Sequence, residues 1–410
     1  MRNSINTGLF FGILAILYVV SPLVSFLVSL LFFKKGVSHF FMVAFAVYFG
    51  YQVGPILDLL NHYNNYLNFK NHSLSEMFLD PFNLFYGQEP YHIVFKYVMA
   101  KFGATDRGFS ACAAAVYAIT FIFFFRQLKP FYNNHLNGIQ LAVLLLMVVS
   151  VDFYWYLGLR FWTGTFFLMI FYTNYVITGN KVMLFFLPLG ALFHYVLILP
   201  AVLFYLSILL KNRRIILMVL IGISYVFKYI EYGFLLYAGK IPFVNSAFRD
   251  KLQTDATLRA LKEQADFFRN DGNIIYQHRT DFIFFAVVLF LLNLYFRNKN
   301  LLRQFPQLFA AVCLTLVVAN FGYSEYVFYT RMYKLVSLLI SLYLFLILSV
   351  PAAKNMRFNI MTKVAILGVA LFCLLISLVQ IRTSVFNIEL WLGNFFVEVP
   401  IQEYSSKIKF

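Results

Sequence analysis

The chain has 410 residues, of which 61% are hydrophobic and only 12% are charged. Runs of about 16 to 26 residues with almost no charge recur along it, which excludes an ordinary soluble domain and favours a polytopic helical membrane protein. The formal net charge of +16 could indicate nucleic acid as a partner, but the positions of the basic residues argue against that.

Ten apolar runs are predicted to be membrane spans. They cover residues 8 to 33, 38 to 57, 108 to 125, 137 to 152, 163 to 179, 214 to 237, 281 to 297, 305 to 322, 331 to 350 and 363 to 381. The first run is too long for the core of a signal peptide and lacks a small-x-small cleavage site, so we interpret it as an uncleaved span. The three cysteines lie inside apolar runs without metal-ligand spacing and are expected to be packing residues.

Short connectors between these runs carry 14 basic residues and no acidic one. The basic residues are Lys34, Lys35, Arg126, Lys129, Lys181, Lys211, Arg213, Arg214, Arg297, Lys299, Arg303, Lys354, Arg357 and Lys363. By the positive-inside rule these connectors are predicted to be cytoplasmic, and the rest of the chain is then nearly neutral. The excess charge is therefore a topology signal, and nucleic-acid binding is not expected.

The apolar segment 182 to 210 is long for one span and short for two. Because its flanking cations are both predicted to be cytoplasmic, we expect a hairpin of two short helices. Pro200 is predicted near the bend, and His194 near the apex, toward the outer leaflet.

The whole chain, 1 to 410, is predicted to form a single transmembrane domain with two extracytoplasmic loops, at 58 to 107 and 239 to 280. Residues 91 to 102 are predicted to form an interfacial helix that is too short to span the membrane. In the second loop an apolar stripe at spacing 3, 4, 3 predicts an amphipathic helix that could act as a lid or be a passive loop. The stripe is Leu258, Leu261, Ala265 and Phe268.

Several catalytic signatures are absent from the sequence. It has no GxGxxG, P-loop, D-x-D, H-E-x-x-H or G-x-S-x-G motif, so no cofactor and no metal are expected. Because the outer compartment holds no nucleotide sugars, a glycosyl transfer there would need a lipid-linked donor.

Four motifs follow one another in the first half of the chain: "DLLNHYNNY", "QEPYHIVFKYVMAKFG", "LGLRFWTG" and "LFHYVLILP". Their order resembles the EpsG-like branch of bacterial polysaccharide polymerases, which is related to Wzy-type O-antigen polymerases. The resemblance covers residues 1 to 210 well and the rest mainly by span pattern. The family usually continues the arginine with Gln and an Ala one turn later, where this chain has Phe161 and Trp162, and it usually has Glu-Pro-Gly, where this chain has Tyr91. These departures bear on substrate fit.

The resemblance implies an all-α, GT-C-like bundle of about 10 to 12 transmembrane helices, with short re-entrant or hairpin helices and a long extracytoplasmic loop. It implies a glycosyltransferase of the bacterial inner membrane that polymerises O-antigen of lipopolysaccharide, capsule or exopolysaccharide, with its active site facing the periplasm or exterior. The implied partners are undecaprenyl-diphosphate-linked repeat units, membrane lipid and a chain-length regulator. The implied transfer is metal-independent and inverting.

Charge developing on the departing diphosphate needs fixed cations, and arginine can bind two phosphate oxygens at once. Arg160 and Arg331, at the outer ends of spans, are therefore predicted to bind the diphosphate. The attacking hydroxyl must lose a proton, so a histidine or carboxylate is expected as the base. The catalytic candidates are His194, Glu89 and Asp58, and the candidate substrate contacts are His92, Arg107, Arg279 and Tyr333.

Structural roles for these residues stay open at this point. Arg160 could snorkel to the interface, Glu89 could cap the helix after Pro90, and His194 could be a packing residue. An O-antigen ligase would share the lipid donor, whereas a lipid-linked oligosaccharide flippase usually has two similar halves, and no internal repeat is evident. A membrane acyltransferase would carry its histidine on the cytoplasmic side.

The topology is testable by labelling introduced cysteines with an impermeant reagent. We expect both termini, Arg160 and His194 to lie on the same outer face as residues 239 to 280. Labelling from outside at position 34 or 213 would contradict this, because the candidate site would then lie in the cytoplasm.

Overall fold

The computed structural model describes residues 6–33, 35–55, 59, 62–64, 73–79, 89–132, 138–150, 160–228, 279–298, 300–323, 326–350, 364 and 367–372. Within these ranges the regular secondary structure is helical. Three helices are long and apolar enough to cross a membrane and are joined by several shorter apolar ones, as expected of a helical membrane protein. Asp58 and the predicted lid, up to residue 278, lie outside the described residues.

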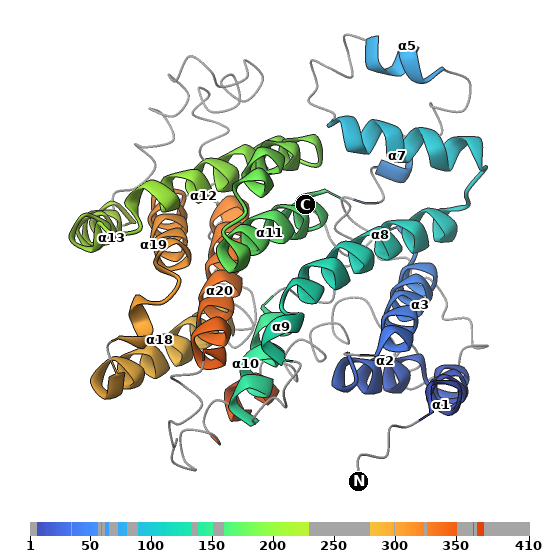
Figure 1. The fold of residues 1–410 in the computed structure, drawn as a ribbon. Coiled ribbons are helices and arrows are strands. Elements are labelled where there is room, and N and C mark those ends of the chain that lie inside the picture. The colour runs from blue at the N-terminus through green and yellow to red at the C-terminus, as the bar shows by residue number, and fades with distance from the viewer. Residues whose placement is uncertain are drawn as a thin grey trace. The chain divides into compact units, whose positions relative to one another are not determined.

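The helices belong to two compact units. The first unit contains α1 (Thr7–Val20), α2 (Pro22–Leu31), α3 (Gly36–Val53), α5 (Leu74–Leu79), α7 (Pro90–Lys101), α8 (Asp106–Gln127), α9 (Lys129–Tyr132), α11 (Phe161–Thr178) and the 3₁₀-helices η3 (Lys181–Leu192) and η4 (Tyr195–Leu197) (Figure 1). The second contains α10 (Gly138–Val149), α12 (Ile198–Leu210, from its second residue), α13 (Arg214–Lys228), α18 (Arg279–Asn298), η5 (Leu301–Arg303), α19 (Pro306–Phe321) and α20 (Tyr326–Ser349).

The run 8 to 33 is not the single span that the sequence predicts, because its helix breaks at Ser21. Ser21 has an extended backbone (φ −156°, ψ 102°), and its hydroxyl accepts the N–H of Val24 as the N-cap of α2. Pro22 follows at the first helical position, which tolerates its missing N–H. The two helices pack together, and the Ser25 hydroxyl donates to the Leu14 carbonyl across them.

Small residues let α3 and α8 pack closely (Figure 1). A Cβ added to Gly50 of α3 would lie 2.5 Å from the Ser110 carbonyl oxygen and 2.9 Å from Ala111 and Ala114 of α8. Ala46, one turn before Gly50, is also buried. Close backbone approach at small residues is a main source of helix association in membranes, where the hydrophobic effect between helices is weak.

Basic residues gather at one end of the first unit. The Phe33 and Phe125 rings meet 5.9 Å apart, which brings the segment before α3 to the C-terminal end of α8. Gln127 and Asn174 are hydrogen-bonded, so α8 and α11 end side by side. The basic residues that these contacts collect are Lys35, Arg126, Lys129 and Lys181. The first unit thus groups its predicted cytoplasmic connectors; the compartment that this end faces stays a prediction.

The predicted hairpin at 182 to 210 is two helical segments, but its break is at His194. The 3₁₀-helix η3 ends at Leu192, and His194 has an extended backbone. Pro200 lies inside α12 and is buried, so its predicted place at the bend is wrong. A 3₁₀-helix rises about 2.0 Å per residue, so the 12 residues of η3 cover about 24 Å. The 18 residues of α11, against which η3 packs, cover about 27 Å.

In the second unit α20 is the central helix. Of its membrane-length window, 94% is buried, against 56% for α3 and 61% for α8. It packs on α10, α18 and α19. The Tyr343 hydroxyl donates to the Leu302 carbonyl at 2.6 Å, and the Gln140 amide donates to Ser349 at 3.2 Å. These bonds satisfy polar groups in an otherwise apolar core.

We expect Gly50→Ala to destabilise the protein by about 1 to 3 kcal/mol, because the added methyl group would overpack the α3–α8 contact. Thermal unfolding in detergent measures the effect. Gly12→Ala in α1 is the matched control, since nothing lies within 4 Å of its Cβ position and alanine favours a helix. Equal unfolding temperatures for Gly50→Ala and the unmodified protein would contradict the packing argument.

Candidate active site

Three predicted site residues from distant segments meet at the other end of the first unit. Glu89 precedes α7, Arg160 precedes α11, and His194 lies in the turn between η3 and η4. Oε2 of Glu89 is 3.2 Å from Nη1 of Arg160, and Oε1 is 3.4 Å from Nδ1 of His194. We call these three residues the Glu89 cluster.

The carboxylate is the most buried member of the Glu89 cluster. Its side chain is 2% exposed, whereas that of His194 is 13% and that of Arg160 is 21% exposed. A buried carboxylate is costly unless it is paired and hydrogen-bonded, and Arg160 supplies the permanent positive charge. Glu89 does occupy the N-cap position of α7, but its side chain makes no capping hydrogen bond. Its contacts with Arg160 and His194 show that its role is not that of a helix cap alone.

A glycine lets the His194 turn approach α11. Gly164 is one turn after Arg160, and a Cβ there would lie 2.6 Å from Cβ of Phe193 and overlap Leu197. Those two residues flank His194 in the sequence. Only a residue without a side chain allows this distance of approach. Gly164 therefore helps to set how close the His194 ring comes to Glu89.

The contacts of His194 Nδ1 depend on its protonation. The same nitrogen is 3.3 Å from the backbone N of Val196 and 3.4 Å from Glu89. An unprotonated Nδ1 accepts the N–H of Val196, whereas a protonated Nδ1 can donate to the carboxylate. The negative charge of Glu89 thus favours a proton on Nδ1, which leaves the Nε2 lone pair on the far side of the ring.

A second set of buried polar groups lies beside the Glu89 cluster on α7. His92 and Lys96 are each 1% exposed, and the ring of His62 meets that of His92 edge-on with centroids 3.9 Å apart. Burial lowers the pKa of the His92 imidazole well below its ordinary value, and nearby groups that carry or can gain a positive charge lower it further. These groups are His62, Lys96, Arg160 and His194. His92 is therefore neutral at physiological pH.

In the part of the chain that the structure describes, both ring nitrogens of His92 and the hydroxyl of its neighbour Tyr91 are buried without a hydrogen-bond partner. A buried polar group left unsatisfied costs about 1 to 3 kcal/mol, which is commonly tolerated where a ligand completes the bonding. Sequence reasoning picked out His92 but missed Lys96. Glu89, His92 and Lys96 are spaced by three and four residues, so they form a polar stripe on an apolar helix. This stripe is the sequence pattern from which Lys96 could have been predicted.

The other predicted site residues lie elsewhere or outside the described residues. Arg107 is in the first turn of α8, with its guanidinium 5.5 Å from the centre of the Tyr51 ring. Tyr333 of α20 belongs to the second unit and contacts the Tyr329 ring. Arg331 is in the same unit, in the second turn of α20, which begins at Tyr326, and it lies near the N-terminal end of the candidate span Phe328–Ser349. Whether that end faces the outside stays a prediction. Arg279 begins α18.

No protein-family model matches the sequence, and no curated protein or solved structure matches it. Among the described residues, no group of three or more His, Cys, Asp or Glu side chains is placed to hold a metal ion. The assignment of chemistry therefore depends on the geometry of the Glu89 cluster and on the motifs that supply its residues.

The ion pair in the Glu89 cluster predicts non-additive effects on stability. Glu89→Gln and Arg160→Gln should each destabilise the protein, because each leaves a buried or half-buried partner uncompensated. The double variant should be less destabilised than the sum by about 0.5 to 3 kcal/mol. Thermal or denaturant unfolding of all four forms measures this coupling.

A control cycle pairs Glu89→Gln with Arg126→Gln, at the far end of α8. These effects should add. Additivity for Glu89 with Arg160 as well would show that the 3.2 Å contact contributes nothing to stability.

Proposed function

We propose that the protein polymerises a bacterial surface polysaccharide, transferring a glycan from undecaprenyl diphosphate to the next lipid-linked repeat unit at the outer face of the inner membrane. The observation that supports this proposal is the convergence of Glu89, Arg160 and His194. They come from three of the four motifs that resemble EpsG-like polymerases. They also supply an arginine for phosphate and a histidine beside a carboxylate for proton transfer.

In the proposed reaction the acceptor hydroxyl attacks the anomeric carbon of the donor. The bond from that carbon to the phosphate oxygen breaks, and undecaprenyl diphosphate leaves with the electron pair. A single displacement of this kind inverts the anomeric centre. Arg160 has five N–H donors, so one edge can hold Glu89 while another binds the diphosphate.

The geometry favours His194 over Glu89 as the base that takes the hydroxyl proton. Glu89 is 2% exposed and already contacts two partners, so a sugar hydroxyl reaches it poorly. With Nδ1 turned toward Glu89, the Nε2 of His194 is the nitrogen that can accept the proton. Glu89 then stabilises the imidazolium that forms, as a carboxylate does behind a catalytic histidine. The shared contribution of Arg331 to the diphosphate stays a prediction, as do the further spans that bring the helix count to 10 to 12.

An O-antigen ligase is the main alternative, since it would use the same lipid donor and a similar cationic site. A flippase for lipid-linked oligosaccharides is the second. The length distribution of surface glycan in cells that lack the gene separates them: single repeat units indicate a polymerase, whereas loss of all surface glycan indicates a ligase or flippase.

Purified protein with lipid-diphosphate-linked repeat units tests the roles within the Glu89 cluster. Arg160→Lys keeps the charge but loses the bidentate fork, so it should retain partial chain extension, whereas Arg160→Ala abolishes it. His194→Ala should bind the lipid substrate normally but extend it about 100-fold to 10,000-fold more slowly, as expected for a lost general base. Binding and extension are measured separately, with chelator present.

Arg214→Ala is the matched control, because Arg214 is likewise an arginine at the N-terminal end of a helix but lies in the second unit, where it donates to the Leu302 carbonyl. It should leave extension unchanged. Normal long chains from Arg160→Ala would rule out the proposed arginine role, and loss of substrate binding in folded His194→Ala would make His194 a binding residue. Activity that disappears with chelator would overturn the metal-free reaction.

A further inference from the structure

A row of aromatic rings follows the contact between α11 and η3. The centre of the Phe167 ring lies 4.9 Å from that of Phe193 and 4.8 Å from that of Phe171. The Phe171 ring in turn stacks on the Phe186 ring, with centres 5.0 Å apart. All four side chains are at least partly exposed, so they form part of the protein surface. We call these four residues the aromatic strip.

The aromatic strip begins beside the Glu89 cluster. Phe193 directly precedes His194, and its ring also meets that of Tyr91 in the first turn of α7, with centres 4.5 Å apart. At the other end of the strip, Phe186 precedes His194 by eight residues. At the rise of a 3₁₀-helix this separation is about 16 Å. A hydrocarbon chain that leaves the cluster along the strip therefore passes its rings in order.

The 3₁₀ form of η3 adds a straight apolar row beside the aromatic strip. In a 3₁₀-helix, residues three apart lie directly above one another. Phe186, Leu189 and Leu192 have this spacing and are 38%, 38% and 43% exposed. The next row faces α11, because a Cβ added to Gly190 would lie 2.6 Å from the Leu168 side chain. The exposed apolar row thus follows the helix axis instead of winding around it.

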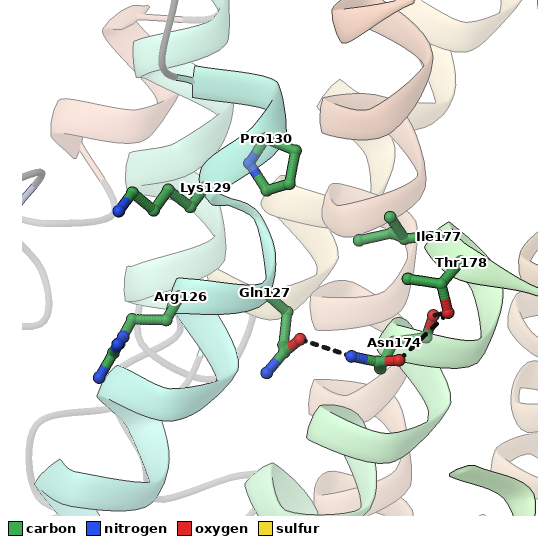
Figure 2. Close-up of a pocket in the computed structure, with 7 residues that line it drawn as sticks. All are labelled: Arg126, Gln127, Lys129, Pro130, Asn174, Ile177 and Thr178. Carbon is green, nitrogen blue, oxygen red and sulfur yellow. Dashed lines mark hydrogen bonds between the residues drawn. The ribbon is translucent and has the colours of Figure 1, made fainter. Parts of the chain in front are cut away.

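A second surface feature of α11 is polar. A pocket of about 370 Å³ opens at the C-terminal ends of α8 and α11 (Figure 2). Asn174 donates to Gln127 at 2.9 Å and accepts from the Thr178 hydroxyl at 3.2 Å. The charged ends of Arg126 and Lys129 extend away from these side chains (Figure 2). Hydrocarbon gains nothing among bonded polar groups, so the aromatic strip is the surface of α11 that suits it.

We propose that the aromatic strip and the adjacent row of η3 hold the polyprenyl chain of the lipid diphosphate that binds at Arg160. This inference rests on the proposed function, which supplies the lipid and the role of the arginine. Membrane lipid is as apolar as the polyprenyl chain, so the chain gains no general hydrophobic advantage on this surface. Its advantage is packing against the rings, together with the high local concentration that the anchored diphosphate gives it.

The test uses the full-length purified protein in phosphatidylcholine nanodiscs, titrated with undecaprenyl diphosphate and, separately, with farnesyl diphosphate. The farnesyl chain is much shorter and covers only the part of the strip nearest the Glu89 cluster. Phe186→Ala removes the far ring, so it should weaken binding of undecaprenyl diphosphate about three- to tenfold and leave that of farnesyl diphosphate unchanged. Phe186→Leu, which keeps η3 apolar, should show the same lipid-selective loss.

Phe185→Ala is the matched control, because Phe185 is the neighbouring phenylalanine of η3, is 80% exposed and lies outside the aromatic strip. It should change neither affinity, and unfolding temperatures confirm that each variant is folded. Equal weakening of undecaprenyl diphosphate by Phe185→Ala and Phe186→Ala would overturn the inference, because any exposed phenylalanine would then serve. Equal weakening of both lipids by Phe186→Ala would also overturn it, since the effect would then concern the diphosphate.

Chain extension on lipid-linked repeat units separates this inference from the proposed function. Lipid binding with the expected pattern but without extension would contradict the polymerase and keep the aromatic strip. Normal extension, with equal affinity for undecaprenyl diphosphate in Phe186→Ala and the unmodified protein, would overturn the strip and keep the polymerase. A protein that binds neither lipid would contradict both.

Discussion

The buried carboxylate of Glu89 is the constraint on which the candidate active site depends. A carboxylate that is 2% exposed in a membrane protein needs a permanent cation and a hydrogen-bond donor close by. Arg160 and His194 meet that need, and each comes from a different segment of the first unit. Three loops are thereby held to one another by one acid, and the arginine that is proposed to bind phosphate is oriented before any substrate arrives.

The carboxylate can reach both partners only because the surrounding backbone permits it. Gly164 lets the turn that carries His194 approach α11, and the 3₁₀ geometry of η3 extends 12 residues to nearly the length of 18 α-helical ones. The tight turn at Gly179, in the left-handed region with φ 72°, reverses the chain between the two helices. His194 consequently lies near the N-terminal end of α11, where Arg160 is located.

Part of this arrangement could be predicted from the sequence. Apolar runs predicted apolar helices, and basic connectors predicted the basic end of the first unit, because hydropathy and charge placement are local properties. The number of spans stays a prediction. The motifs contain Glu89, Arg160 and His194, which the structure brings together, and His92, which lies beside them; their roles stay predictions. The break at Ser21, the 3₁₀ form of η3 and the bend at His194 rather than Pro200 depend on packing between distant segments, which no local pattern encodes. Lys96 was not predicted as a site residue because the polar stripe that it forms with Glu89 and His92 is short. Asp58 and the predicted lid stay predictions.

The helix type of η3 also sets a mechanical length. Twelve residues rise about 24 Å as a 3₁₀-helix but about 18 Å as an α-helix, so conversion of the segment would shorten it by about 6 Å. A displacement of that size is twice the length of a hydrogen bond and would withdraw the His194 ring from the carboxylate. The length of η3 therefore sets the position of His194 relative to Glu89. Any change in the helical winding of η3 also moves the histidine.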